Sequence, residues 1–337
     1  MHNPWGDEQT RYFYELTPDK IFKALQSQGV QTTGHCSTMF SMENRVYDVE
    51  FQFDKEPANR WEHHRILKFY RPGRWNQQQI LDEHQFLADL DEAEVPVVKP
   101  EKFANGSTLA LDEETGLYFT VFPRVGGRTP DEFSPDMLQQ MGRFMARMHA
   151  VGKQRSANHR ITINPDSYGA NHLKKLLTPG VMPLDLHDPY KDVVMKIVDK
   201  TRKWFEESEI QRIHGDCHRA NILLTPEGTK WIDFDDMLMG PCVQDMWLLI
   251  PGFEEPGHTR ELFLEAYESM HPFDRKTLRL IEPLRALRFI HFSAWIAHRW
   301  QDPVFSATFP DFGTRPYWQE QITDLNEQLA KIESLQE

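Results

Sequence analysis

Residues 213–224 read IHGDCHRANILL, in which a cluster of polar side chains runs directly into three apolar ones. His214, Asp216, His218 and Asn221 are poor material for a hydrophobic core, because burying a polar group without a partner costs several kcal/mol or so. The apolar residues after them predict the first strand of a buried hairpin. The polar cluster therefore indicates a functional site at the beginning of this strand.

A tight hairpin is expected directly after the polar cluster. Residues 222–224 (ILL) and 230–234 (KWIDF) flank the turn sequence TPEGT. Within it, residues 226–228 (PEG) suit a three-residue loop, a type I turn closed by a left-handed residue, which glycine adopts without steric cost. This loop would place Asn221 directly opposite Asp233, with their side chains on one face about 5 Å apart.

Asn221 and Asp233 are predicted to form a metal site. An Asn amide oxygen beside an Asp carboxylate offers the hard oxygen ligands that Mg²⁺ uses when phosphate oxygens complete its coordination. Asp216 lies five residues before Asn221, so the same loop would bring a second carboxylate to this site. Such a carboxylate can accept a hydroxyl proton and orient the nucleophile for in-line attack on phosphorus. The three residues together predict phosphoryl transfer.

Two other interpretations of the cluster are weaker. Asp216 and Asn221 could each be ordinary turn formers, but the joint arrangement of HGD, four residues, Asn, a hairpin and IDFDD disfavours this. A zinc site would need a fourth ligand at tetrahedral geometry, and the sequence offers none beside its three candidates His214, Cys217 and His218.

The motif HGDCHRAN resembles the catalytic loop of the aminoglycoside phosphotransferase-like kinases, a relative of HRDxxxxN in protein kinases. IDFDD stands where protein kinases carry DFG, and GPCVQDMWLL is similar to that family's next segment. Further segments resemble, in the same order, the bacterial stress-response Ser/Thr protein kinases of this family: MENRVY (42–47), LKFYRPGRW (67–75), QILDEHQF (79–86), EVPV (94–97), FPRVGGR (122–128) and IEPLRALR (281–288). The resemblance extends from about residue 40 to 300.

The resemblance implies an α+β fold of the two-lobed protein-kinase type, with ATP as co-substrate and Mg²⁺ as cofactor. By that likeness Asp216 is the proton acceptor, Asn221 and Asp233 are magnesium ligands, Asp233 also counts as catalytic, and Ser41 contacts phosphate. It also implies a Ser/Thr protein acceptor and a role in a bacterial stress response.

The sequence leaves the acceptor open. Asp216 would serve the hydroxyl of a protein or that of a small molecule such as choline, homoserine or an aminoglycoside. A catalytically silent nucleotide-binding protein is a third possibility, which the presence of Lys68, Glu83, Asp216, Asn221 and Asp233 disfavours. Between Asp233 and Asp245 there are eleven residues and no APE motif, so regulation by phosphorylation of an activation loop is not expected.

The layout along the chain predicts a nucleotide-binding lobe at 1–122, a hinge at 123–130 and a helical lobe at 131–337. In the first lobe we expect one helix near 77–90 and strands, because VYDVEF, RILKFY and LYFTVF are rich in β-formers. Ser134 followed by Pro135 predicts a helix start. Further helices are expected at 189–207, 241–250, 260–270, 277–300 and 317–334, interrupted by a single strand pair.

Lys68 and Glu83 are predicted to pair at the nucleotide site. Lys68 shares a strand face with Ile66 and Tyr70, and Glu83 shares a helix face with apolar residues. A lysine among apolar neighbours is costly unless its ammonium group meets an anion. Such a pair would hold Lys68 on the α and β phosphates of ATP, as in kinases; the alternative is that Lys68 snorkels to solvent.

The remaining nucleotide contacts are predicted from loops. No GxGxxG or GxxxxGK motif occurs near the N-terminus, so STMFSMENRVY would have to hold phosphates with backbone amides and the Ser41 hydroxyl. The connector residues Phe122 and Arg124 would offer backbone hydrogen bonds to adenine. Asp245 is expected to cap its helix or to hydrogen-bond the HGD loop, and at least one of Asp235 and Asp236 to face solvent.

The composition of the chain limits which partners and which cellular compartment are expected. The chain carries 51 acidic and 38 basic residues, a formal charge of −13, which would repel nucleic acid and anionic membranes. The sequence contains no window of about 18 apolar residues, so we expect no membrane-spanning segment. Three cysteines without CxxC spacing fit a reducing cytoplasm, with Cys217 a plain buried thiol. We expect a cytoplasmic monomer that binds ATP and a hydroxyl acceptor.

Overall fold

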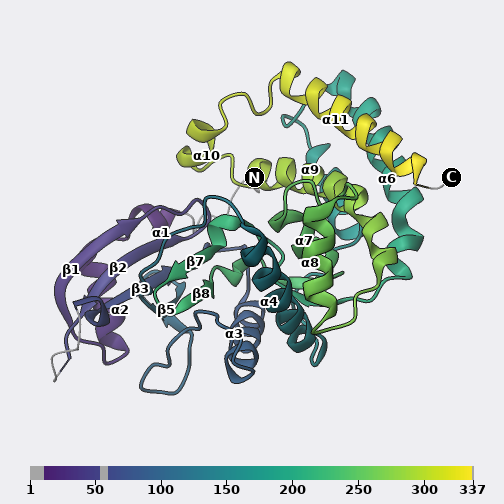
Figure 1. The fold of residues 1–337 in the computed structure, drawn as a ribbon. Coiled ribbons are helices and arrows are strands. Elements are labelled where there is room, and N and C mark those ends of the chain that lie inside the picture. The colour runs from purple at the N-terminus through teal and green to yellow at the C-terminus, as the bar shows by residue number, and fades with distance from the viewer. Residues whose placement is uncertain (1–10, 54–59, 336–337) are drawn as a thin grey trace. The chain divides into compact units, whose positions relative to one another are not determined.

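The computed structural model describes residues 11–53 and 60–335, which form two compact units (Figure 1). The strand-rich unit contains the described residues of 7–131 and 219–235, and the helical unit those of 132–218 and 236–337. One of the boundaries between the units falls between His218 and Arg219, inside the HGDCHRAN motif. The lobe and hinge boundaries expected from sequence stay a prediction.

One antiparallel sheet organises the strand-rich unit, with strand order β1-β2-β3-β5-β4. The three strands expected from their β-formers are β2, β3 and β5. In β2, Tyr47, Val49 and Phe51 are buried, and Asp48 is buried as well, with His64 Nδ1 and Arg124 Nε 2.7 and 3.1 Å from its carboxylate. The strands are β1 (Thr32–Met39), β2 (Arg45–Phe51), β3 (His64–Phe69), β4 (Ala110–Asp112) and β5 (Leu117–Pro123).

The described residues of this unit form three α-helices, so the expectation of a single helix is wrong. The expected one is α3 (Gln77–Glu92), and the others are α1 (Arg11–Tyr14) and α2 (Pro18–Ser27). The signal for α2 was present in the sequence: Thr17 caps the helix by accepting a hydrogen bond from the Lys20 amide, and proline occupies its first turn.

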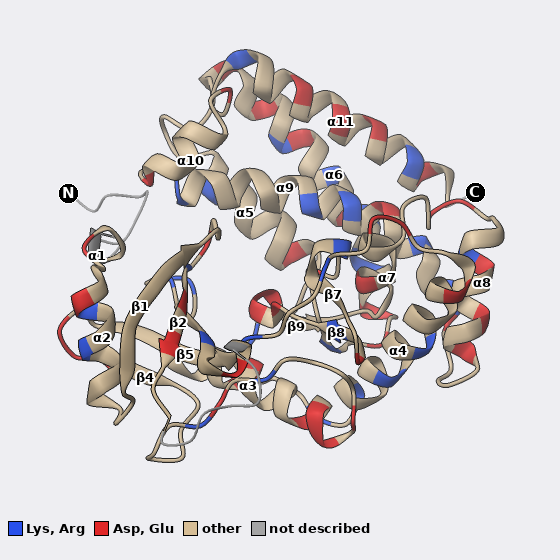
Figure 2. Ribbon diagram, turned by 60° about the vertical axis from the view of Figure 1, so that its left-hand side comes forward, with Lys and Arg blue, Asp and Glu red and all other residues tan. Residues whose placement is uncertain are grey.

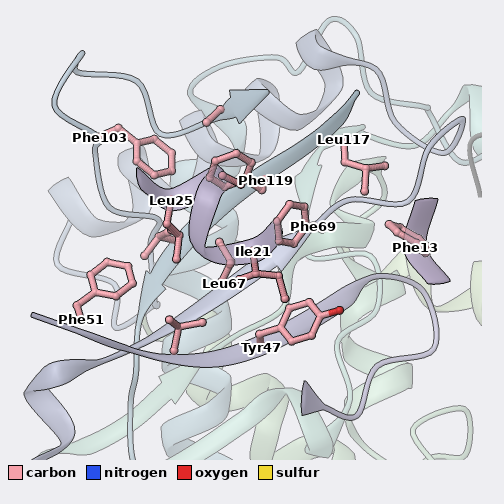
Figure 3. Packing of buried hydrophobic residues seen from close by; sticks show 14 residues of the cluster. Phe13, Ile21, Leu25, Tyr47, Phe51, Leu67, Phe69, Phe103, Leu117 and Phe119 are labelled. Atoms are coloured by element: carbon pink, nitrogen blue, oxygen red, sulfur yellow. The ribbon is translucent and has the colours of Figure 1, made fainter. Parts of the chain in front are cut away.

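Helix α2 packs its apolar side chains against the sheet. Ile21 and Leu25 of α2 lie among Leu67, Phe69 and Phe119, and all five are buried (Figure 3). This core supports β3 and β5 on the side of the sheet where α2 packs. It therefore fixes the strand that carries Lys68.

Phe119 offers a test of this core. Its ring centroid lies 5.2 Å from that of Phe69 and 5.6 Å from that of Phe103, and the side chain is fully buried. We expect Phe119→Ala to lower the free energy of unfolding in urea by about 3–5 kcal/mol. Phe40→Ala is the control, because Phe40 is 91% exposed and its loss should change stability by no more than about 0.5 kcal/mol. Equal effects of the two changes would contradict the packing described.

The helical unit is built from eight α-helices among its described residues. Helix α4 packs against α8, and α6 packs against α9 and α11 (Figure 1). The expected helices near 189–207, 241–250, 260–270, 277–300 and 317–334 correspond to α6, α7, α8, α9 and α11, and Ser134 caps α4 as expected. The helices are α4 (Pro135–Lys153), α5 (Asn171–Leu176), α6 (His187–Glu206), α7 (Val243–Leu249), α8 (His258–Glu268), α9 (Ile281–His298), α10 (Pro303–Thr308) and α11 (Arg315–Ser334).

Two strand pairs, not one, occur among the described residues after 131. The pair β6 (Gln211–Ile213) and β9 (Leu238–Gly240) lies in the helical unit, and the hairpin β7 (Ile222–Thr225) and β8 (Gly228–Trp231) belongs to the strand-rich unit. The single pair expected from sequence is therefore corrected. Short helical segments complete the structure: a π-helix at Pro165–Ala170 and 3₁₀ turns at Arg60–His63, Leu184–Leu186, Arg219–Asn221, Phe234–Asp236 and Arg275–Leu280.

Acidic and basic residues are interspersed along helices such as α11 (Figure 2). Within the part of the chain that the structure describes, no helix combines the length and the apolar character that a membrane-spanning segment needs.

Candidate active site

Strand β3 places Lys68 in a buried position beside two aspartates. Lys68 Nζ lies 3.0 Å from Asp235 Oδ1 and 3.5 Å from Asp233 Oδ1, and 5.0 Å from the centre of the Tyr70 ring. Burial by itself would lower the pKa of Lys68, but the charges of Asp235, Glu83 and Asp233 outweigh it and raise that pKa. The ammonium group therefore stays charged.

Glu83 of α3 is buried and acts electrostatically on Lys68, consistent with the predicted pair. The two aspartates on Lys68 were not predicted as its partners. Helix α3 also contacts their segment, because the Phe86 ring meets the Phe234 ring edge-on at 5.8 Å. Helix α3, β3 and the IDFDD segment thus meet around one lysine.

Asp235 is the buried centre of a polar network. Its side chain is 5% exposed, and its Oδ2 accepts hydrogen bonds from Asn44 Nδ2, at 3.0 Å, and from Arg74 Nη1. Asn44 in turn accepts a hydrogen bond from the Arg71 amide through Oδ1, at 3.1 Å. Asp235 is thus turned inward on several donors, whereas the side chain of Asp233 is 58% exposed.

Arginine side chains hold the loop between β1 and β2, which is predicted to bind phosphates. Arg71 donates from Nε to the Glu43 carbonyl at 2.8 Å and from Nη2 to the Met42 carbonyl at 3.2 Å. Ser41 Oγ accepts a hydrogen bond from the Asn44 amide at 3.3 Å. These bonds order a loop that lacks glycine; its contact with phosphate stays a prediction.

The connector residues are tied to the sheet. Phe122 lies opposite Ile66 in the β3–β5 ladder. The Arg124 amide donates to the His64 carbonyl at 3.4 Å, and the Arg124 guanidinium lies 4.1 Å from the Trp61 ring centre. Adenine contacts from these two residues stay a prediction, and any contact with the Arg124 amide would have to share it with His64.

The register of the β7–β8 hairpin corrects one detail of the sequence analysis. Ile222 lies opposite Trp231 and Thr225 opposite Gly228, so the loop has two residues instead of three. Gly228 has φ +125° and still belongs to the ladder, where the prediction had placed it in the loop. Asn221 consequently lies opposite Ile232, whose amide donates to the Asn221 carbonyl at 3.0 Å, and not opposite Asp233.

Asn221 and Asp233 nevertheless lie at the same end of the hairpin. Asn221 ends a 3₁₀ turn and is 7% exposed. Asp233 has φ +61°, a conformation that is uncommon for residues other than glycine and that clusters at functional sites. Although Asn221 and Asp233 are not directly opposite each other, an amide oxygen and an exposed carboxylate remain suitable ligands for Mg²⁺ when phosphate oxygens supply the others.

In the helical unit both carboxylate oxygens of Asp216 have cationic or ionisable partners. Arg288 Nη2 lies 3.0 Å from Oδ1 and His218 Nε2 lies 3.2 Å from Oδ2. Burial by itself would raise the pKa of Asp216, but the hydrogen bond with His218 and the charge of Arg288 outweigh it and hold that pKa well below the ordinary aspartate value. Asp216 is therefore an ionised carboxylate with a fixed orientation.

Asp245 holds the loop that carries Asp216. It is fully buried in α7 and accepts hydrogen bonds from the His214 amide at 2.8 Å and the Gly215 amide at 2.9 Å, with His149 Nε2 3.2 Å from its Oδ2. The expectation that Asp245 hydrogen-bonds the HGD loop is confirmed. Both carboxylate oxygens of Asp245 are thus engaged inside the fold, where they orient the loop.

Gly215 is required by geometry. It has φ +85°, and a Cβ atom there would overlap the Asp236 carbonyl oxygen. We expect Gly215→Ala to lower the free energy of unfolding by at least about 2 kcal/mol, through backbone strain and overlap. Gly180→Ala is the control, because Gly180 has φ +92° but nothing within 4 Å of a Cβ atom. Urea unfolding should separate the two variants, and equal losses would contradict the overlap.

The cysteines and the zinc interpretation can be judged from the side chains. The three cysteines form no disulfide, and burial raises the pKa of the Cys217 thiol well above its usual range. Across residues 11–53 and 60–335, no group of three or more His, Cys, Asp or Glu side chains is placed to hold a metal ion. The structure gives the zinc interpretation no support, and Cys217 is a buried thiol as expected.

Five residues of these networks were not singled out from the sequence. Their contacts span long stretches of chain, 191 residues for Asn44 with Asp235 and 72 for Arg288 with Asp216. The segments MENRVY, LKFYRPGRW and IEPLRALR contain all but one of them, so the resemblance marked the right segments without assigning roles. The five are Asn44, Arg71, Arg74, His149 and Arg288.

Comparison with known proteins supports the resemblance. A model described as the phosphotransferase enzyme family matches residues 42–281. Stress response kinase A of Escherichia coli O157:H7 is 39% identical over 322 residues, which cover 95% of this chain and 94% of that protein. The serine/threonine protein kinase RdoA of Salmonella typhimurium (strain LT2) is 36% identical over 322 residues, which cover 94% of this chain and 93% of that protein. The resemblance to bacterial stress-response kinases is confirmed.

The fold has solved counterparts. The structure of the amicoumacin kinase hAmiN in complex with AMP-PNP, Ca²⁺ and Ami matches with a TM-score of 0.68 and 19% identity, covering 93% of this chain and 95% of that one. At this identity the likeness establishes the fold alone. The predicted α+β, kinase-like fold is confirmed.

Proposed function

Because the chain belongs to the phosphotransferase enzyme family, we propose that it is an ATP- and Mg²⁺-dependent kinase that phosphorylates Ser or Thr hydroxyls of proteins. The names of its relatives, stress response kinase A and serine/threonine protein kinase RdoA, support a protein acceptor and a role in a stress response. The three unpaired cysteines fit the reducing cytoplasm as its place of action.

The chemistry assigned to the chain is one in-line displacement. The acceptor oxygen forms a bond to the γ-phosphorus of ATP, the bond from that phosphorus to the β–γ bridging oxygen breaks, and ADP leaves. Asp216 accepts the proton of the acceptor hydroxyl and orients its oxygen. Lys68, kept in place by Glu83, holds the α and β phosphates.

Asn221 and Asp233 are the residues that would hold Mg²⁺. Their oxygen atoms suit this hard cation, and few protein ligands are needed where phosphate oxygens supply others. When bound, Mg²⁺ would supply positive charge that neutralises part of the negative charge of the phosphates. Ser41 and the backbone of Phe122 and Arg124 complete the proposed ATP contacts.

One observation carries the proposal most directly: a buried lysine on a central strand, within 3.5 Å of two aspartates from the segment that follows the hairpin. A buried ammonium group and carboxylates at this position of a kinase-like fold are the parts that phosphate and metal require. A silent nucleotide-binding protein would be expected to have lost at least one of them.

A small-molecule hydroxyl acceptor is the second candidate. It is favoured by the solved counterpart, a kinase whose complex contains AMP-PNP, Ca²⁺ and Ami. Incubating the protein with labelled ATP, Mg²⁺, one basic and one acidic generic protein and a panel of small alcohols tests both candidates. We expect label in the protein acceptor; label only in an alcohol would favour the second candidate, and label in neither would contradict the kinase proposal.

Asn44 gives a prediction for ATP binding that needs no acceptor. Because Asn44 links the phosphate loop to Asp235, Asn44→Ala should weaken MgATP binding by about tenfold, the effect of losing about 1.4 kcal/mol. Isothermal titration calorimetry measures it. Asn105→Ala is the control, because Asn105 also accepts a backbone hydrogen bond, from the Ser107 amide at 2.9 Å, in an exposed turn. Unchanged affinity of Asn44→Ala would contradict the role given to the network.

A further inference from the structure

Arg288 stands directly beside the proposed base. It lies on α9, and its guanidinium Nη2 is 3.0 Å from Asp216 Oδ1 while 40% of its side chain is exposed. His218 occupies the other oxygen and is 39% exposed. A ligand that reaches the Asp216 carboxylate therefore also meets a fixed, permanently charged guanidinium.

We propose that Arg288 makes the acceptor site select against cationic alcohols, so that the acceptor hydroxyl belongs to a neutral or acidic group. The inference rests on the proposed function and narrows its acceptor. This selectivity would separate the chain from a kinase for choline or an aminoglycoside, because those substrates carry positive charges close to the reacting hydroxyl.

The argument is one of distance. A hydroxyl that gives its proton to Asp216 must come within roughly 3 Å of that carboxylate. An ammonium group two carbons from the hydroxyl would then lie within about 4–8 Å of the Arg288 charge, where like charges repel appreciably at the edge of a protein. The Asp216 carboxylate cannot fully offset this repulsion by attracting the ammonium group, because Arg288 and His218 already engage both of its oxygens.

The next turn of α9 offers no opposing charge. His291 stacks on Tyr168 with ring centroids 4.3 Å apart, and its Nδ1 lies 2.9 Å from His172 Nε2. Burial and the charge of Lys175 lower the pKa of His172 to about 4, so this ring is neutral near pH 7. None of these three side chains carries the carboxylate that an ammonium group would need as a partner.

A different role for Arg288 would leave a different signature. If the guanidinium acted only on the phosphoryl group in transfer, its removal would lower kcat equally for every acceptor. Selection by charge instead changes the ratio of kcat/KM between acceptors that differ only in charge. The ratio therefore separates the two roles.

The test compares matched acceptors in the full-length protein. One pair is choline and its uncharged analogue 3,3-dimethylbutan-1-ol; the other is a set of peptides with one Ser flanked by Asp, Ala or Lys. We expect the wild type to favour the uncharged alcohol and the Asp- and Ala-flanked peptides by about tenfold or more in kcat/KM. Arg288→Gln should reduce that preference at least about fivefold, and Arg288→Lys should retain most of it.

Arg315→Gln is the matched control, because Arg315 forms a single ion pair with Asp185 at 2.8 Å in the same unit and is 50% exposed; its preference should equal that of the wild type. A preference unchanged in Arg288→Gln, or a wild type that favours choline, overturns the inference. A wild type that phosphorylates only alcohols refutes the protein acceptor, yet the alcohol pair still tests Arg288. Phosphorylation of no acceptor overturns both proposals. Thermal unfolding of each variant verifies that it is folded.

Discussion

Replacing Asp216 with Asn should lower turnover by roughly 10²–10⁴-fold, the usual contribution of a general base. The Asn side chain has the same shape but cannot accept the proton of the acceptor hydroxyl. Because no ATP contact is assigned to Asp216, affinity for MgATP should stay within about threefold of the wild type. Steady-state ADP production measures the first effect and isothermal titration calorimetry the second.

The control for this prediction is Asp185→Asn, which removes a carboxylate of the same unit that is 62% exposed and paired with Arg315. It should keep the turnover of the wild type. An Asp216→Asn variant that keeps more than about a tenth of wild-type turnover would show that the base is another group.

Replacing Lys68 with Met should have the second large effect. Methionine keeps the length of the side chain but removes the charge that faces Asp235 and Asp233. We expect MgATP affinity to fall by at least about tenfold, and the free energy of unfolding by about 1–3 kcal/mol, since buried Asp235 loses a cationic partner but keeps Arg74 and Asn44. Calorimetric titration and urea unfolding provide the two readouts.

A double-mutant cycle sharpens this prediction. If Lys68 and Asp235 interact directly, the stability loss of Lys68→Met with Asp235→Asn should be smaller than the sum of the single losses by at least about 0.5 kcal/mol. Lys99→Met is the control, because Lys99 forms an ion pair with Asp91 at the surface. Loss of this pair should lower the free energy of unfolding by no more than about 1 kcal/mol. Strict additivity of the Lys68 and Asp235 changes would contradict their contact.

Local patterns predicted the parts of the fold that depend on neighbours in sequence. Strands β2, β3 and β5 follow from runs of β-formers, and α4 follows from Ser134 and Pro135. The hairpin was predicted one residue out of register, because turn sequence alone does not reveal whether Gly228 belongs to the loop or to the ladder. A slip of one residue changes which side chains share a face.

In the candidate site, too, local sequence predicted some residues and could not predict the long-range contacts. Lys68, Glu83 and Asp245 were recognisable because a charged residue on an apolar face, or at a helix start, needs a partner. The contact of Arg288 with Asp216 could not be predicted, because α9 periodicity does not reveal which residue 72 positions away its arginine meets. Likewise, nothing local in MENRVY indicates that Asn44 reaches Asp235.

The most direct test of the central claim, a magnesium-dependent phosphate site at the end of the β7–β8 hairpin, is calorimetric titration of ATP with and without Mg²⁺. We expect Mg²⁺ to tighten ATP binding to the wild type, and to the control Glu227→Gln at the exposed hairpin tip, by about tenfold or more. In Asp233→Asn most of this Mg²⁺ dependence should be lost. An Asp233→Asn variant with the full Mg²⁺ dependence of the wild type would contradict the proposed site.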